Sequence, residues 1–159
     1  SAEYVKRCAS CYSRAADAVC DGSYTPELAA SLKEELAEVF NRGFWDGYYQ
    51  GAKLGQWREV YGSQATLKKV YCGKISNWFD RIGVAEISVE SASLSVGDRA
   101  MVIGATTGVV EFTVEDMRVN LQSAQTAGKG VRCSVAIDPA TCPGGRLRRG
   151  DKVYIWQEK

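Results

Sequence analysis

The residues of this chain that are best suited to chemistry are its thiols. The 159-residue sequence contains six cysteines and no histidine. A chain without imidazole offers no Ser-His or Cys-His nucleophile pair and no histidine metal ligand. Any catalysis by this sequence would therefore use carboxylates, thiolates or lysines. The six cysteines are Cys8, Cys11, Cys20, Cys72, Cys133 and Cys142.

Two of these residues, Cys8 and Cys11, form a C-x-x-C pair. Redox pairs of this type usually lie at a helix N-terminus, and structural zinc sites need four ligands, usually as two close pairs. Here the pair falls inside a helical pattern and a second pair is missing. Because free cysteine is among the most buried residue types, we predict interior packing, with metal or redox use as the alternative. We expect reduced thiols, no metal site and a cytoplasmic protein.

A second set of chemically active side chains is a basic cluster near the end of the sequence. RNA phosphates are bound by cations that gather on one face, so the cluster predicts either RNA contacts or a solvated loop. The formal net charge is only +1, which gives no overall attraction to nucleic acid. The cluster comprises Arg146, Arg148, Arg149 and Lys152, and a smaller one comprises Lys68, Lys69 and Lys74.

Between residues 41 and 55, glycines recur at a spacing of four with aromatic rings between them. Such spacing predicts a close-packed junction between two units, whether the segment is helical or a series of turns. The alternative is an aromatic wall that faces a substrate, built from Phe44, Trp45 and Tyr48. Arg42 would then hold a carboxylate or phosphate through two hydrogen bonds.

The elements that must position these residues follow from periodicity. Apolar side chains from Tyr4 to Val19 recur at helical spacing, and Gly22 is a natural helix end. Thr25-Pro26-Glu27 is a strong helix start. From Val70 onward, short apolar runs alternate with turns, which predicts strands, including one over residues 117–121. No run approaches the roughly 18 apolar residues of a membrane span.

A pentapeptide pattern, L-x-x-G-D, occurs at residues 94–98 and again at 147–151, each time before a predicted strand. Two copies of one tight turn indicate equivalent corners of a single sheet structure. The sequence therefore predicts an α+β fold, in which an N-terminal helical segment is followed by a small antiparallel β-barrel. We expect a helical segment at 1–62, a linker at 63–69 and the barrel at 70–159.

The barrel region resembles domain two of elongation factor Tu and other translation GTPases, through these corners and the turn Ala127-Gly128-Lys129-Gly130. The whole chain resembles the collagenase-like peptidases of family U32. Residues 41–51 match the family signature N-R-G-F-x-x-G-[FY]-Y-x-G. Further similarity to the family lies at residues 4–15, 82–86, 106–109, 114–118 and 148–154.

The resemblance implies a larger parent protein with an upstream catalytic domain. Family members are described as peptidases or collagenases, and some hydroxylate RNA bases or ubiquinone, several with an iron–sulfur cluster held by upstream cysteines. We therefore predict a C-terminal, non-catalytic fragment without a cofactor of its own, acting as a substrate-engaging or stabilising domain beside that catalytic domain. The alternative is an RNA-binding module of an enzyme that hydroxylates tRNA or rRNA bases. The candidate binding residues are Arg42, Phe44, Trp45, Tyr48, Arg146, Arg148, Arg149 and Lys152.

Overall fold

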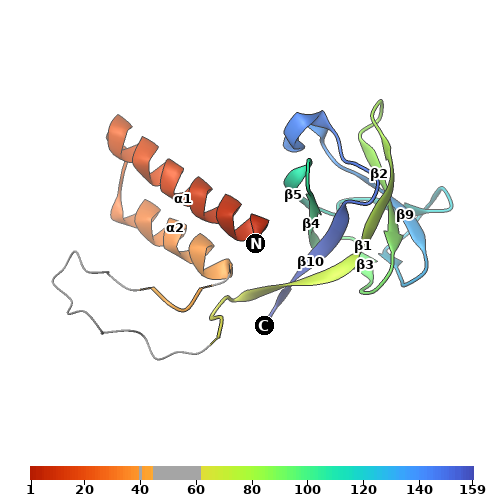
Figure 1. Cartoon of the computed structure of the whole chain (residues 1–159), viewed down its shortest axis with the longest axis horizontal. Coiled ribbons are helices and arrows are strands. Elements are labelled where there is room, and N and C mark those ends of the chain that lie inside the picture. Colours follow the sequence, from red (N-terminus) through yellow and green to blue (C-terminus); the bar gives the residue numbers. More distant parts are fainter. Residues whose placement is uncertain (40, 45–61) are drawn as a thin grey trace. The chain divides into compact units, whose positions relative to one another are not determined.

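The computed structural model describes residues 1–39, 41–44 and 62–159, which form two compact units (Figure 1). The first, here called the helical unit, comprises residues 3–68 with residues 1, 158 and 159. The second, here called the sheet unit, comprises residues 69–157 with residue 2. The first strand begins at Leu67, inside the segment predicted to be a linker.

Two helices make up most of the described part of the helical unit, and the end of the first and the start of the second lie where local sequence predicts. Helix α1 (Ala2–Asp21) stops at Gly22, whose φ of 78° is left-handed and whose N–H bonds the Ala18 carbonyl. Helix α2 (Pro26–Glu38) starts at Thr25, whose hydroxyl accepts a 3.2 Å hydrogen bond from the Leu28 N–H. Neither helix, nor any other in the described residues, is long and apolar enough to cross a membrane.

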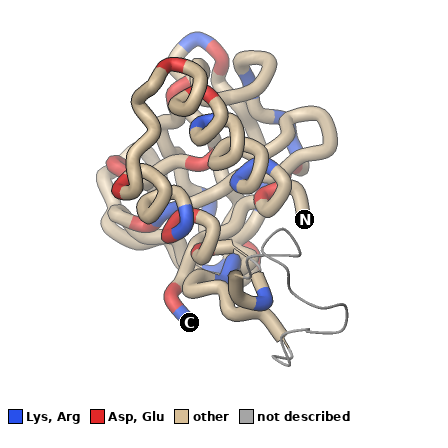
Figure 2. Tube along the Cα trace, turned by 90° about the vertical axis from the view of Figure 1, so that its left-hand side faces the viewer, with Lys and Arg blue, Asp and Glu red and all other residues tan. Residues whose placement is uncertain are grey.

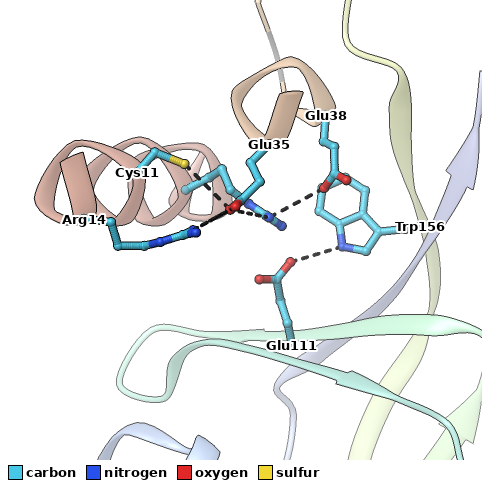
Figure 3. Close-up of polar contacts among 7 residues, drawn as sticks. Cys11, Arg14, Glu35, Glu38, Glu111 and Trp156 are labelled. Atoms are coloured by element: carbon cyan, nitrogen blue, oxygen red, sulfur yellow. Dashed lines mark hydrogen bonds and ion pairs between the residues drawn. The ribbon is translucent and has the colours of Figure 1, made fainter. Parts of the chain in front are cut away.

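The buried face of α1 includes only part of the apolar stripe that periodicity predicts. Of that stripe, Cys11 is buried and Cys8 and Ala15 are half-buried, but Val5, Tyr12 and Val19 are 62%, 71% and 63% exposed. Arg7 and Arg14 of the same helix reach carboxylates of α2. Arg14 donates to both oxygens of Glu35, at 2.8 and 2.9 Å (Figure 3).

The sheet unit is built on a long open sheet in the order β5-β4-β10-β1-β2-β9-β6-β7. The ladders of β1 with β2, β2 with β9, β9 with β6, β6 with β7, and β4 with both β5 and β10 are antiparallel. The strands are β1 (Leu67–Phe79), β2 (Val84–Val89), β4 (Arg99–Gly104), β5 (Gly108–Thr113), β6 (Met117–Val119), β7 (Gln122–Ser123), β9 (Arg132–Ala136) and β10 (Lys152–Glu158). Strands β3 (Leu94–Ser95) and β8 (Thr126–Ala127) pair separately.

The α+β class with an antiparallel sheet is confirmed, but the sheet is not closed, so the word barrel describes it only loosely. Strands β5 and β7 lie at the two ends of the strand order. Beyond β5, Val114 bonds the turn at Gly97 and Asp98 instead of another strand. At the other end β7 has only two residues. Among the described residues β5 and β7 do not pair with each other, so the sheet stays open.

The core of the sheet unit is formed by every second residue along the strands, because successive side chains of a strand point to opposite faces of the sheet. Its fully buried members include Ile75, Ile87, Leu94, Val102, Val110, Met117, Val135 and Val153. Cys72 and Cys133 lie in the same cluster, at 0% and 1% exposure. These two thiols thus act as small apolar side chains.

The two L-x-x-G-D segments adopt the same structure, which confirms their prediction as equivalent corners. In each, the Asp carboxylate accepts a backbone N–H three residues earlier: Ser95 to Asp98 at 2.8 Å, and Arg148 to Asp151 at 2.9 Å. Both glycines have left-handed φ, 94° and 90°. Each corner then exchanges two backbone hydrogen bonds with an extended residue, Val114 in the first case and Ile75 in the second.

Candidate functional site

The aromatic candidates lie mostly outside the described residues. Trp45 and Tyr48 are among residues 45–61, as are three of the four regularly spaced glycines. Arg42 is exposed, and Phe44 is half-buried, with the Lys33 ammonium 5.5 Å from its ring centroid. The substrate-facing wall therefore stays a prediction.

Three of the four C-terminal cations do come together. Arg146, Arg148 and Arg149 line a groove of about 310 Å³, with Asp80 and Trp78 on its other side. Lys152 lies on β10 opposite Ile103 of β4 and does not line this groove. The cluster in the sequence is thus divided by the fold.

The second corner fixes the position of Arg149. Gly150 donates to the Ile75 carbonyl at 2.8 Å, and the Arg149 Nε donates to the Ser76 carbonyl at 2.8 Å. Ser76 lies at an irregularity between β1 and β2. A bulge of this kind turns its carbonyl away from the regular ladder, which makes it available to the guanidinium.

Beneath this corner, the Asp151 side chain is buried, and its Oδ2 accepts two hydrogen bonds. It accepts the Thr107 hydroxyl at 2.6 Å and the Arg148 N–H at 2.9 Å. A Cβ at Gly104 would lie 2.0 Å from the Asp151 Oδ1, so only glycine fits there. The corner is therefore a rigid support for the cations that it carries.

A second cationic groove, of about 690 Å³, lies on the other side of Arg149. Lys74 and Arg132 line it with Arg149, and Glu86 is the one carboxylate among its lining residues. The Arg132 Nη1 is 3.8 Å from Glu86. Sequence analysis placed Lys74 in a different cluster and did not select Arg132, because these residues meet only through the pairing of β1, β2 and β9.

Lys74 is held in place by neighbouring polar groups. Its Nζ lies 2.7 Å from Glu90, which also accepts the Tyr71 hydroxyl at 2.6 Å. The hydrogen bonds from Lys74 and Tyr71 lower the pKa of Glu90. The hydrogen bond to Glu90 raises the pKa of Tyr71 to about 12. Elsewhere, cations and carboxylates are interspersed along the trace (Figure 2).

An apolar groove of about 520 Å³ lies on the outer face of β2, β9 and β6. Its apolar side chains are Phe79, Ile82, Val84, Leu121 and Ala136. Ile82 is 69% exposed and Leu121 is 91% exposed. Glu86 lines this groove and the second cationic groove alike, so the two form one continuous surface, here called the outer face.

The rim residue Leu121 has a strained backbone. Asn120 and Leu121 have φ values of 51° and 65° and form the two-residue turn between β6 and β7. The prediction of a strand over 117–121 was wrong for these two residues, since Asn tolerates the left-handed region that such hairpin turns require. Leucine in this region costs roughly 1–2 kcal/mol, which the chain accepts while leaving the side chain in solvent.

The thiols behave largely as predicted. Cys11, Cys72, Cys133 and Cys142 are buried, Cys8 is half-buried and Cys20 is exposed, and all six are free. Burial raises the pKa of Cys72 to about 11 and that of Cys133 to about 12. Within the described residues, no group of three or more Cys, Asp or Glu side chains is placed to hold a metal ion.

Residues 1–59 match the family model for Peptidase family U32. Two Porphyromonas gingivalis proteins, both named collagenase, are 46% and 45% identical over 150 residues, which cover 94% of this chain and 36% and 42% of theirs. An uncharacterized protease of Methanocaldococcus jannaschii is 34% identical over 161 residues, covering 99% of this chain and 38% of that protein. The chain thus spans less than half the length of these relatives.

Among solved structures, the C-terminal domain of a Geobacillus thermoleovorans protein described as a U32 peptidase aligns with a TM-score of 0.47 and 11% identity. That alignment covers 54% of this chain and 90% of the Geobacillus domain.

Proposed function

Because this chain belongs to peptidase family U32, we propose that it is an accessory, non-catalytic part of a larger peptidase and engages that enzyme's polypeptide substrate. Two relatives carry the name collagenase and a third the name protease. A collagen-like polypeptide is therefore the proposed substrate class. Catalysis belongs to an upstream domain, in the larger share of the parent that this chain does not span.

The observation that carries this proposal is the apolar groove of the outer face. Exposed apolar surface bordered by polar side chains marks interaction sites in soluble proteins. Here Phe79, Ile82 and Leu121 remain 41%, 69% and 91% exposed around one groove. An extended polypeptide suits such a surface, because its alternate side chains can enter the groove while its backbone stays hydrated.

The exposed leucine at this turn supports a role in binding. The two-residue hairpin accounts for the left-handed backbone of Leu121 but does not require an apolar side chain there. Leu121 packs little against its own chain, since almost all of its side chain is in solvent. We infer that the apolar side chain is kept there for a ligand.

The iron–sulfur cluster implied by the resemblance is assigned to the parent's upstream domain. Cys72 and Cys133 are enclosed in the sheet core, and burial keeps their thiols protonated. Thiolates are the form that binds such clusters. These two residues therefore fit a packing role and do not fit cluster ligation.

The test compares Leu121→Gly with the unmodified chain. Glycine relieves the left-handed strain, so the sheet unit should gain about 1 kcal/mol of stability while binding to denatured collagen weakens several-fold. Collagen affinity is measured on immobilised chains, and stability by urea unfolding. Unchanged collagen binding in a stabilised variant, or no binding by the unmodified chain, would contradict the proposal.

A parallel measurement with bulk tRNA, at about 50 mM and about 500 mM salt, tests the RNA alternative. RNA binding through the arginine grooves should fall steeply with salt and should not depend on Leu121. Salt-sensitive tRNA binding together with no collagen binding would replace the proposed function by the RNA alternative.

A further inference from the structure

We infer that the outer face selects acidic polypeptide segments, in which a carboxylate lies about four residues from an apolar side chain. This inference rests on the proposed function and adds the chemistry of the ligand. The apolar side chain occupies the groove lined by Val84, Ala136 and Leu121. The carboxylate is bound in the adjoining groove by Lys74, Arg132 and Arg149.

The first argument is the order of side chains along β9. Arg132, Ser134 and Ala136 alternate with the buried Cys133 and Val135, so the first three share the outer face. In the ladder of β2 with β9, each of these three residues lies opposite one residue of β2. Ala136 lies opposite Val84, Ser134 opposite Glu86, and Arg132 opposite Ser88. The face therefore changes from apolar through polar to cationic in two-residue steps.

The second argument is distance. Four residues separate Ala136 from Arg132, and a strand rises about 3.3 Å per residue, so the apolar and cationic ends are roughly 13 Å apart. An extended ligand covers the same span in about four residues. One segment of polypeptide can therefore reach both grooves, and the spacing of its two anchoring groups is fixed by the protein.

The third argument is charge. Three cations line the second cationic groove, with Glu86 as its one carboxylate, so an added carboxylate is the complementary group. Lys74 is partly neutralised by Glu90. Arg149 forms no ion pair with any described residue, and its Nε bond to Ser76 holds the guanidinium in place. An oriented guanidinium binds a carboxylate through two parallel hydrogen bonds.

The same face disfavours a long polyanion. Asp116 and Glu86 line the apolar groove together with Arg118, whose Nε lies 3.7 Å from the Asp116 carboxylate, and this groove adjoins the cations directly. A nucleic acid that follows the cations would bring its next phosphates against these carboxylates and against exposed leucine and isoleucine. A polypeptide with one or two carboxylates and an apolar neighbour meets both halves of the face.

The experiment titrates the isotopically labelled chain with synthetic peptides of about eight residues and follows backbone amide shifts. The first peptide has leucine and aspartate four positions apart, the second replaces that aspartate by asparagine, and the third replaces the leucine by serine. Shifts should concentrate at residues 84–88 and 132–136. The aspartate peptide should bind about tenfold more tightly than the asparagine peptide at about 50 mM salt, with the preference lost at about 500 mM.

Two variants assign that preference to the grooves. Arg132→Gln should abolish most of the preference, because Arg132 is one of the three cations that line the groove. The variant should still fold, since the Arg132 side chain is 70% exposed. Arg149→Gln should also abolish most of the preference, with a thermal melt to show that the corner is intact. Lys152→Gln is the matched control. It removes one positive charge from the same stretch of sequence but lines neither groove, so the preference should remain.

The outcomes separate this inference from the proposed function. Equal affinity for the aspartate and asparagine peptides would overturn the acidic preference and leave polypeptide binding in place. Equal effects of Arg132→Gln and Lys152→Gln would also overturn it, since the preference would then reflect overall charge. No shift with any peptide or with denatured collagen would overturn the proposed function as well.

Discussion

The helical unit and the sheet unit reach a folded state by different means. In the sheet unit, one continuous cluster of buried apolar side chains draws on most of the strands. In the described residues of the helical unit, the buried apolar side chains are Cys11, Ala18, Leu32, Val39 and Ala65. Since burial of apolar area is the main stabilising contribution, the described residues of the sheet unit contribute more stability than those of the helical unit.

Polar contacts make up a larger part of the stabilising contacts in the helical unit than in the sheet unit. In the helical unit, Glu35 of α2 joins Arg14 and approaches the Cys11 thiol at 3.9 Å (Figure 3). Arg7 adds a 3.5 Å ion pair to Glu38. In the sheet unit, a contact such as Trp156 Nε1 to Glu111, at 3.3 Å, adds to a core that exists without it.

Several apolar side chains of α1 are exposed and so add little to the stability of the helical unit. Val5, Tyr12 and Val19 stay largely in solvent, so their transfer from water contributes little to folding of the helical unit. The comparison teaches that an apolar pattern along the sequence does not by itself give a core. What matters is whether the neighbouring element covers the apolar face.

Gly73→Ala, in the sheet unit, should cause the largest loss of stability among the variants that test this comparison. A Cβ at this position would lie 2.0 Å from the Ser88 carbonyl oxygen, so β1 and β2 would have to separate. We expect a loss of about 3 kcal/mol in the free energy of unfolding, measured by urea denaturation. Gly128→Ala is the control, because its Cβ would meet nothing within 4 Å. Similar values for the two variants would show that the sheet is less tightly built than described.

In the helical unit, Leu32→Ala should cost about 2 kcal/mol, because Leu32 is 5% exposed and its site is only partly enclosed. Hydrogen exchange should show faster opening of α1 and α2 while the sheet amides stay protected. Val19→Ala, on the exposed stripe, should have almost no effect. Equal opening of both units would mean that they unfold as one.

Glu35→Gln should have a smaller effect, about 1 kcal/mol, since exposed and half-buried ion pairs are weak individually. Removing this carboxylate leaves Arg14 without its 2.8 Å partner. The difference from the unmodified chain should shrink in about 1 M salt. Glu34→Gln changes the neighbouring, exposed carboxylate and should be neutral. A loss for Glu35→Gln that does not depend on salt would point to packing as the cause.

The smallest expected effect concerns the rate at which a thiol reagent labels each cysteine. This rate compares the two units without a substitution. At about pH 8 a disulfide reagent should modify Cys20 first, since it is exposed. Cys72 and Cys133, whose pKa values are raised to about 11 and about 12 by burial, should react only when the sheet unit opens. Because these pKa values are raised from 9.0, the sheet unit should lose stability as the pH rises above 9.0. Rapid reaction of Cys72 in the folded chain would contradict the burial.

Sequence reasoning succeeded for most features that depend on near neighbours. The end of α1 was predicted from Gly22 and the start of α2 from Thr25, because capping involves only the adjacent turn. The two corners were predicted from a five-residue pattern, because the carboxylate and the N–H that it accepts are three residues apart. The turn at Leu121 was missed, since leucine is a poor signal for a left-handed residue.

The candidate site was predicted only in part. Arg146, Arg148 and Arg149 line one groove as adjacent residues of one corner. Arg149 meets Lys74 and Arg132 only because β1, β2 and β9 lie side by side, and the apolar groove also needs β6. Neither groove can therefore be predicted from spacing along the chain.

By itself the sequence determined the end of α1, the start of α2, the strand alternation, the two corners and the family. Each of these is set by contacts within a few residues or by a motif. Only the tertiary structure decided which face of α1 is buried, that the sheet stays open, and that apolar and cationic grooves meet at Glu86. These features depend on strand register and helix rotation, which are selected by the sum of many long-range contacts and by no single stretch of residues.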